Sequence, residues 1–187
     1  MTHRLLASFR QALALCVLLF GTIAFAHADV AVNVSGNVAS AAIVLPGNIG
    51  ADLTISFDST QNLSAANLGI TAQLVNVNAS GLLARLPDSQ LVSVPAAFPV
   101  LITVEPSGDF SFTNSYLLSV HTHNLGYAPG TPLRLFKAPL GGNFVDITED
   151  VRPGSVDTRG REGGFSQFLI VADLRPNSVV AAGKFSA

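Results

Sequence analysis

The feature that most restricts the fold of this chain is a series of short segments in which apolar and polar residues alternate. In one of them, Leu53, Ile55 and Phe57 occupy alternate positions, with Thr54 and Ser56 between them. Successive side chains of a β-strand point to opposite faces of the sheet, so this period of two predicts strands with one buried face. The same period occurs in residues 30–34, 70–74 and 100–104.

Turn-forming residues separate these segments, for example at residues 46–48 (PGN) and 141–143 (GGN). About ten short strands punctuated in this way predict an all-β fold, an antiparallel β-sandwich, with a closed barrel as the alternative. Residues 168–172 (FLIVA) are continuously apolar, which is typical of a central strand covered on both faces. No stretch of helical length has an apolar stripe, so we expect at most one short helical turn, at residues 64–68, where Ser64 can cap its start.

The first 28 residues have the pattern of a secretory signal peptide. Basic residues are followed by an uncharged apolar run over residues 12–25, and residues 26–28 (AHA) have the small-x-small pattern of a cleavage site. We therefore expect a signal peptide over residues 1–28, with cleavage before Asp29. An uncleaved anchor is the alternative, although the run is shorter than the roughly 20 residues that a membrane-spanning helix needs.

The chain that follows, residues 29–187, has the size of one domain, and we expect a single β-sandwich domain there. Two small sheets joined at residues 86–99, which contain three prolines, are the alternative. Without Arg4 and Arg10, 8 basic residues stand against 12 acidic ones, a net charge of −4. This charge predicts no nucleic-acid partner, and no membrane span is expected after cleavage. The only cysteine, Cys16, leaves with the signal, and a cysteine-free exported domain indicates a bacterial periplasm or exterior.

Two sets of segments resemble known proteins. Residues 133–137 (LRLFK), 144–148 (FVDIT) and 165–168 (FSQF) resemble a β-hairpin pattern found in immunoglobulin-like accessory domains of secreted bacterial proteins. Residues 121–125 (HTHNL) together with 129–136 (PGTPLRLF) resemble an uncharacterised family of exported proteobacterial proteins. The first resemblance implies that the sandwich is immunoglobulin-like, and neither one supplies a catalytic residue.

The sharpest local feature is the pair His121 and His123. Alternate side chains of a strand share a face, so both imidazoles are expected on one side of the sheet, opposite Leu118 and Val120. Two histidines can form half of a zinc or copper site, and without cysteine the third donor must be a carboxylate. The candidates are Asp109, Asp146, Glu149 and Asp150. The alternative is two half-exposed histidines that form hydrogen bonds with the following turn.

The acidic residues after position 145 could suggest a calcium site. However, Arg159 and Arg161 lie among them, which favours a solvated hairpin face of mixed charge. The Gly-x-Ser-x-Gly motif of a nucleophile elbow is missing, and the sequence contains no tryptophan to line a sugar-binding cleft. We therefore predict no enzyme activity and no cofactor.

These observations favour a secreted, non-catalytic β-sandwich that acts by contact with another protein or a cell-envelope component. One alternative is a metal- or small-ligand-binding periplasmic protein that uses His121 and His123. Another is a pilin-like structural subunit, because residues 29–38 alternate apolar residues as a strand donated to a neighbour must.

Overall fold

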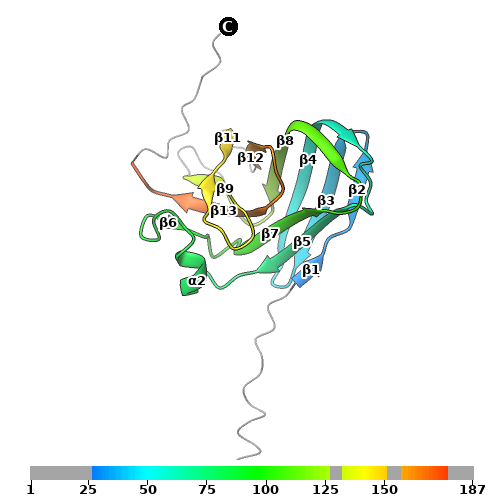
Figure 1. The fold of residues 1–187 in the computed structure, drawn as a ribbon. Helices are drawn as coiled ribbons and strands as arrows, with labels where there is room; N and C mark the ends of the chain where they lie inside the picture. Colours follow the sequence, from blue (N-terminus) through cyan, green and yellow to red (C-terminus); the bar gives the residue numbers. More distant parts are fainter. Residues whose placement is uncertain (1–26, 127–131, 151–156, 177–187) are drawn as a thin grey trace, which may run out of the picture.

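The computed structural model describes residues 27–126, 132–150 and 157–176. Their strands form two antiparallel sheets packed face to face, which confirms the predicted all-β sandwich (Figure 1). Sheet A has the order β1 (His27–Asp29), β5 (Leu68–Leu74), β7 (Val100–Pro106), β13 (Gln167–Asp173), β9 (Leu133–Ala138) and β10 (Val145–Asp146), and β6 (Val92–Ser93) also pairs with β13. Sheet B has the order β11 (Thr148–Asp150), β12 (Asp157–Glu162), β8 (Ser111–Thr122), β4 (Ile49–Gln61), β3 (Val38–Leu45) and β2 (Val32–Ser35).

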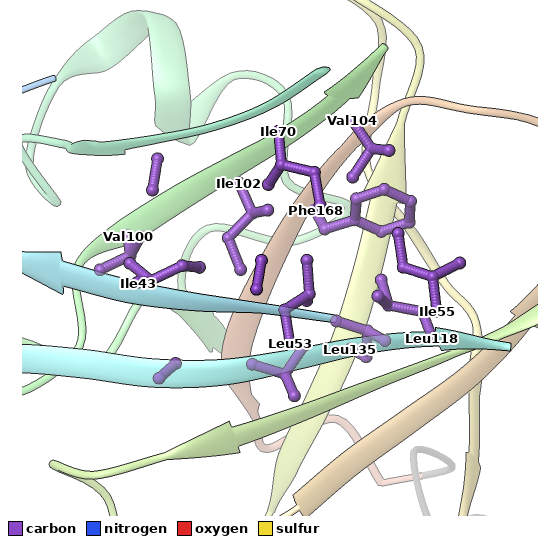
Figure 2. Close-up of a cluster of buried hydrophobic side chains, with 14 of the residues drawn as sticks. Ile43, Leu53, Ile55, Ile70, Val100, Ile102, Val104, Leu118, Leu135 and Phe168 are labelled. Carbon is purple, nitrogen blue, oxygen red and sulfur yellow. The ribbon is translucent and has the colours of Figure 1, made fainter. Parts of the chain in front are cut away.

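The main hydrophobic core lies between the two sheets. In β4, Leu53, Ile55 and Phe57 are buried and the residues between them face outward, as the alternation predicts. Figure 2 shows side chains of both sheets meeting in this core: Ile43, Leu53, Ile55 and Leu118 from sheet B, and Ile70, Val100, Ile102, Val104, Leu135 and Phe168 from sheet A. Each fully buried side chain of this kind contributes about 1.5–3 kcal/mol, so the core is the main source of stability.

Strand β13 is covered on both faces, as its continuous apolar sequence predicts. Phe168 and Ile170 belong to the core between the sheets, whereas Leu169 and Val171 belong to a second hydrophobic cluster on the outer face of sheet A. The segment between β5 and β7 covers this outer face and contains α2 (Ser80–Leu83) and β6 (Figure 1). The buried members of the second cluster are Leu82, Leu86, Val92, Val94, Leu101, Phe136, Ala138, Phe144, Leu169 and Val171.

The predicted position of the helical turn is wrong. Residues 64–67 form a turn before β5, which begins at Leu68, and the side chain of Asn67 accepts a hydrogen bond from the backbone of Ser64 at 2.8 Å. Among the described residues, the α-helical turn is α2 instead. Its N-cap residue is Ala79, which offers no side-chain bond, so the sequence contains no capping signal there. Packing of Leu82 into the second cluster accounts for the helical turn.

At each edge of the sandwich, the chain passes from one sheet to the other. At the first edge, β1 pairs with β5 in sheet A and β2 then pairs with β3 in sheet B. At the second edge, β10 pairs with β9 and β11 pairs with β12, and between them the N–H of Ile147 donates to Leu135 O at 3.0 Å. The outermost strands of the two sheets, β1, β2, β10 and β11, are all short, so they offer little unpaired backbone to another chain.

The N-terminal alternation of apolar residues is used within the domain itself, since β2 pairs with β3 of the same chain. The predicted signal peptide, residues 1–28, lies outside the described residues except for His27 and Ala28, which are part of β1. In the parts of the chain that the structure describes, no helix has the length and apolar composition needed to cross a membrane.

Candidate metal centre

The two histidines of the HTH segment lie on the outer face of sheet B. His121 is near the end of β8, and His123 follows just after that strand. As expected, Leu118 and Val120 point into the core, so the histidine side chains point away from it. In the sheet register, His121 lies opposite Asp52 of β4.

Three side chains converge at this point: Asp52, His121 and His123. Each offers one ligand atom, and these atoms all lie within 4.8 Å of one another. The Nε2 atom of His123 lies 3.0 Å from the Oδ2 atom of Asp52, and the two imidazole centroids are 5.7 Å apart. The side chains are 58%, 44% and 47% exposed, respectively, so solvent ions can reach all three. We call these three residues the histidine–aspartate cluster.

Two imidazoles and one carboxylate form a donor set that suits zinc and other divalent transition metals. Ligand atoms of a tetrahedral zinc ion lie roughly 3.3 Å apart, so the side chains must rotate inward by a small amount to bind one. Their exposure permits this rotation, and the only contact that it breaks within the cluster is the exposed pair of His123 and Asp52, which contributes about 0–1 kcal/mol. The residues present therefore fit a three-ligand site with a position left for water.

Asp157 supports the orientation of His121 from the strand on its other side. Asp157 of β12 lies opposite His121 in the register, and its Oδ1 atom is 2.9 Å from Nδ1 of the imidazole. With Nδ1 in this hydrogen bond, Nε2 is the nitrogen of His121 that can bind a metal ion. A carboxylate that holds the second nitrogen of a ligating histidine is a common feature of metal sites in proteins.

Gly50 makes room for the second imidazole. A Cβ atom at this position would lie 2.8 Å from Nδ1 of His123, so no larger residue fits without moving the ring. The backbone N–H of His123 donates to Gly50 O at 2.9 Å, and the N–H of Gly50 donates to Oδ1 of Asn124 at 2.8 Å. These contacts fix the backbone beside the cluster.

The third member of the cluster is not one of the carboxylates expected from the sequence. Those expected were Asp109, Asp146, Glu149 and Asp150. Asp146 accepts hydrogen bonds from the backbone and side chain of Thr148, and Glu149 forms an ion pair with Arg161 at 3.3 Å. Asp109 accepts a hydrogen bond from Asn62, and the side chain of Asp150 lies outside the described residues.

Asp52 takes the place of these candidates because of strand pairing. It is on the polar side of the alternating β4 sequence, and the register of β4 with β8 places it beside His121. The alternation in the sequence shows that Asp52 faces outward, but the residues around it do not specify which residue of β8 lies opposite. The ion pairs of Glu149 with Arg161 and of Asp157 with Arg159 agree with the mixed-charge interpretation of the acidic hairpin.

The described residues thus define a two-sheet antiparallel β-sandwich with an exposed histidine–aspartate cluster on one outer face. The chain belongs to DUF6689, a family of unknown function, and the match covers residues 14–187. This membership agrees with the resemblance to an uncharacterised family. Comparison with curated proteins and with solved structures finds no match.

Proposed function

We propose that this protein is an exported, non-catalytic β-sandwich that binds a divalent transition-metal ion through Asp52, His121 and His123. The observation that carries the proposal is the convergence of three ligand atoms within 4.8 Å on the outer face of sheet B. Export, to the periplasm or exterior of a bacterium, rests on the signal-like pattern of residues 1–28. An immunoglobulin-like arrangement of the sandwich is part of the same proposal.

The surroundings of the cluster favour binding over catalysis. The three side chains lie on an exposed sheet face, whereas sites that transform small molecules are usually concave and enclose most of the substrate. A neutral imidazole pair and one carboxylate leave one positive charge on a bound divalent ion, which suits capture of the ion or a shared contact with an acidic group of a partner.

The first test is metal binding by the purified protein. Zinc, copper, nickel and calcium are titrated in turn by isothermal calorimetry and by thermal unfolding. We expect one zinc or copper ion per chain, and no calcium. At 100 times the dissociation constant, binding adds about 2.7 kcal/mol, which at about 2–4 °C per kcal/mol raises the melting temperature by several degrees.

Variants identify the ligands. The double substitution His121→Ala and His123→Ala should abolish the metal-induced shift, and Asp52→Asn should weaken binding because a neutral amide replaces an anionic ligand. Glu149→Gln, which removes an exposed carboxylate outside the cluster, is the matched control and should bind as the wild type does. Identical behaviour of all variants would leave the histidines as surface residues, and contact with another protein or an envelope component would become the favoured function.

Asp157→Asn tests the supporting carboxylate. The amide can still accept a hydrogen bond from His121, but it no longer stabilises the imidazole by its charge, and we expect metal affinity to fall by about 10–100-fold. The titration is repeated with this variant at a fixed pH. Unchanged affinity would show that Asp157 does not support the site.

A further inference from the structure

A cavity opens on the covered outer face of sheet A, whereas the histidine–aspartate cluster lies on the outer face of sheet B. It has a volume of about 240 Å³ and lies between α2 and strands β5 and β7. Leu82 and Leu101 of the second hydrophobic cluster line it, together with Val75, which packs against that cluster. The cavity is therefore a gap in an apolar layer, open to solvent on one side.

One charged side chain lines this cavity, that of Arg85. Its Nε atom donates to Gly142 O at 2.7 Å, its Nη2 atom donates to Oε1 of Gln167 at 2.7 Å, and the guanidinium lies 4.5 Å from the centre of the Phe144 ring. All three partners are neutral. No carboxylate forms an ion pair with Arg85 in residues 27–126, 132–150 and 157–176, and Nη1 makes no hydrogen bond there.

This guanidinium is half-buried without a counter-charge. Burial lowers the pKa of Arg85, because removal from water disfavours the charged form. A desolvated charge is costly unless an opposite charge compensates it. The hydrogen bonds to Gly142 and Gln167 hold the guanidinium in place beside the cavity.

We infer that this cavity binds a small aliphatic carboxylate, whose anionic group pairs with Arg85 and whose apolar chain lies between Leu82 and Leu101. Arginine is suited to this task because its planar donors bind both oxygens of a carboxylate. The volume is below the range of about 300–1,000 Å³ that drug-sized ligands occupy, so the ligand is a short chain. Charge complementarity selects the anion, and the apolar walls select the chain.

The test is a calorimetric titration of the full-length chain with octanoate, below the concentration at which it forms micelles. Octyltrimethylammonium, with the same chain and a positive head, and 1-octanol, with no charge, are the comparison ligands. We expect saturable binding of one octanoate per chain, and at least about tenfold weaker binding of the other two, since about 1.4 kcal/mol of charge pairing gives that ratio. Equal binding of all three, or none of octanoate, would overturn the proposal.

Gly81→Leu tests the location without touching Arg85. Gly81 lines the cavity, and a Cβ atom there would have nothing within 4 Å, so a leucine side chain can enter the space without displacing the backbone. We expect octanoate affinity to fall by about tenfold or more. The fold should be unharmed, because leucine is a better helix former than glycine. Ala84→Leu, an exposed position just after α2, is the control and should leave binding unchanged.

Arg85→Gln should also abolish octanoate binding. This substitution also removes the hydrogen bond to Gly142 and so lowers stability, whereas Gly81→Leu keeps the hydrogen bonds of Arg85 to Gly142 and Gln167. Undiminished octanoate binding by a folded Gly81→Leu protein would place the ligand elsewhere and overturn the inference. The metal proposal is unaffected in either case, because its cluster lies on the other sheet.

Discussion

The outer faces of the two sheets differ in what covers them. On sheet A, the segment that contains α2 and β6 lies over the strands, so β13 is buried on both sides. On sheet B, the strands β4 and β8 have one buried face and one that solvent reaches. Within one sandwich, the continuously apolar strand β13 belongs to the covered sheet, and the alternating strands β4 and β8 belong to the open one (Figure 1).

The two faces also handle charge differently. On the open face, the side chains of the histidine–aspartate cluster are exposed, which leaves them room to move toward an ion. On the covered face, charge has to be compensated within the protein: Asp173 is almost fully buried and pairs with Arg175 at 2.6 Å. Arg85 is the contrasting case on that face, and the carboxylate proposed above is its missing counter-charge.

We expect the greatest loss of stability from a substitution on the covered face. Phe136→Ala removes a ring that is fully buried in the second hydrophobic cluster, and we expect a loss of about 3–5 kcal/mol in the free energy of unfolding. Urea denaturation measures this loss. A cost below about 1 kcal/mol would mean that the covering segment is loosely packed and that the two faces are more alike than the structure shows.

The next effect concerns the buried carboxylate of the covered face. Burial alone would raise the pKa of Asp173, but the hydrogen bonds and positive charge of Arg175, together with the charge of Arg134, lower it overall. A carboxyl with a lowered folded-state pKa stabilises the protein above its unfolded pKa, about 3.9, and this contribution is lost as the pH falls further.

Asp173→Asn should therefore cost about 1.5–3 kcal/mol at pH 7, the usual value of hydrogen bonds to a charged group. The difference from the wild type should shrink when urea unfolding is repeated at pH 3. A difference that stays constant between the two pH values would show that the charge of Asp173 contributes no stability.

A smaller effect is expected at the edge where the chain passes between the sheets. A Cβ atom at Gly160 would lie 2.6 Å from Ile147 O, and backbone cannot move away as a flexible side chain can. Gly160→Ala should lower the unfolding free energy by about 1–3 kcal/mol. Gly126→Ala, where a Cβ atom meets nothing within 4 Å, is the control. Equal stability of both variants would mean that this edge is not closed tightly.

The smallest effect is expected on the open face. Ser119 lies on the outward side of β8, and Ser119→Ala should change the unfolding free energy by no more than about 0.5 kcal/mol. Urea denaturation of this variant and of Phe136→Ala compares the unfolding free energies lost on the open face and on the covered face. A large loss would indicate that something covers sheet B in the folded protein.

Properties that depend on neighbours along the chain could be predicted from the residues alone. The alternation around Ile55 predicted a strand with one buried face, and the apolar run at residues 168–172 predicted a strand buried on both faces. The spacing of His121 and His123 predicted that both side chains lie on the same face of the sheet. All three follow from the period of a strand, which is local.

Which residues meet across strands depends on the three-dimensional fold. Asp52 joins the histidines because β4 pairs with β8, about seventy positions away, in one register out of several that the alternation allows. The helical turn lies at α2 rather than at residues 64–68 because Leu82 packs against sheet A, although its sequence has no cap. Register and packing depend on contacts between distant segments, and local propensity does not specify them.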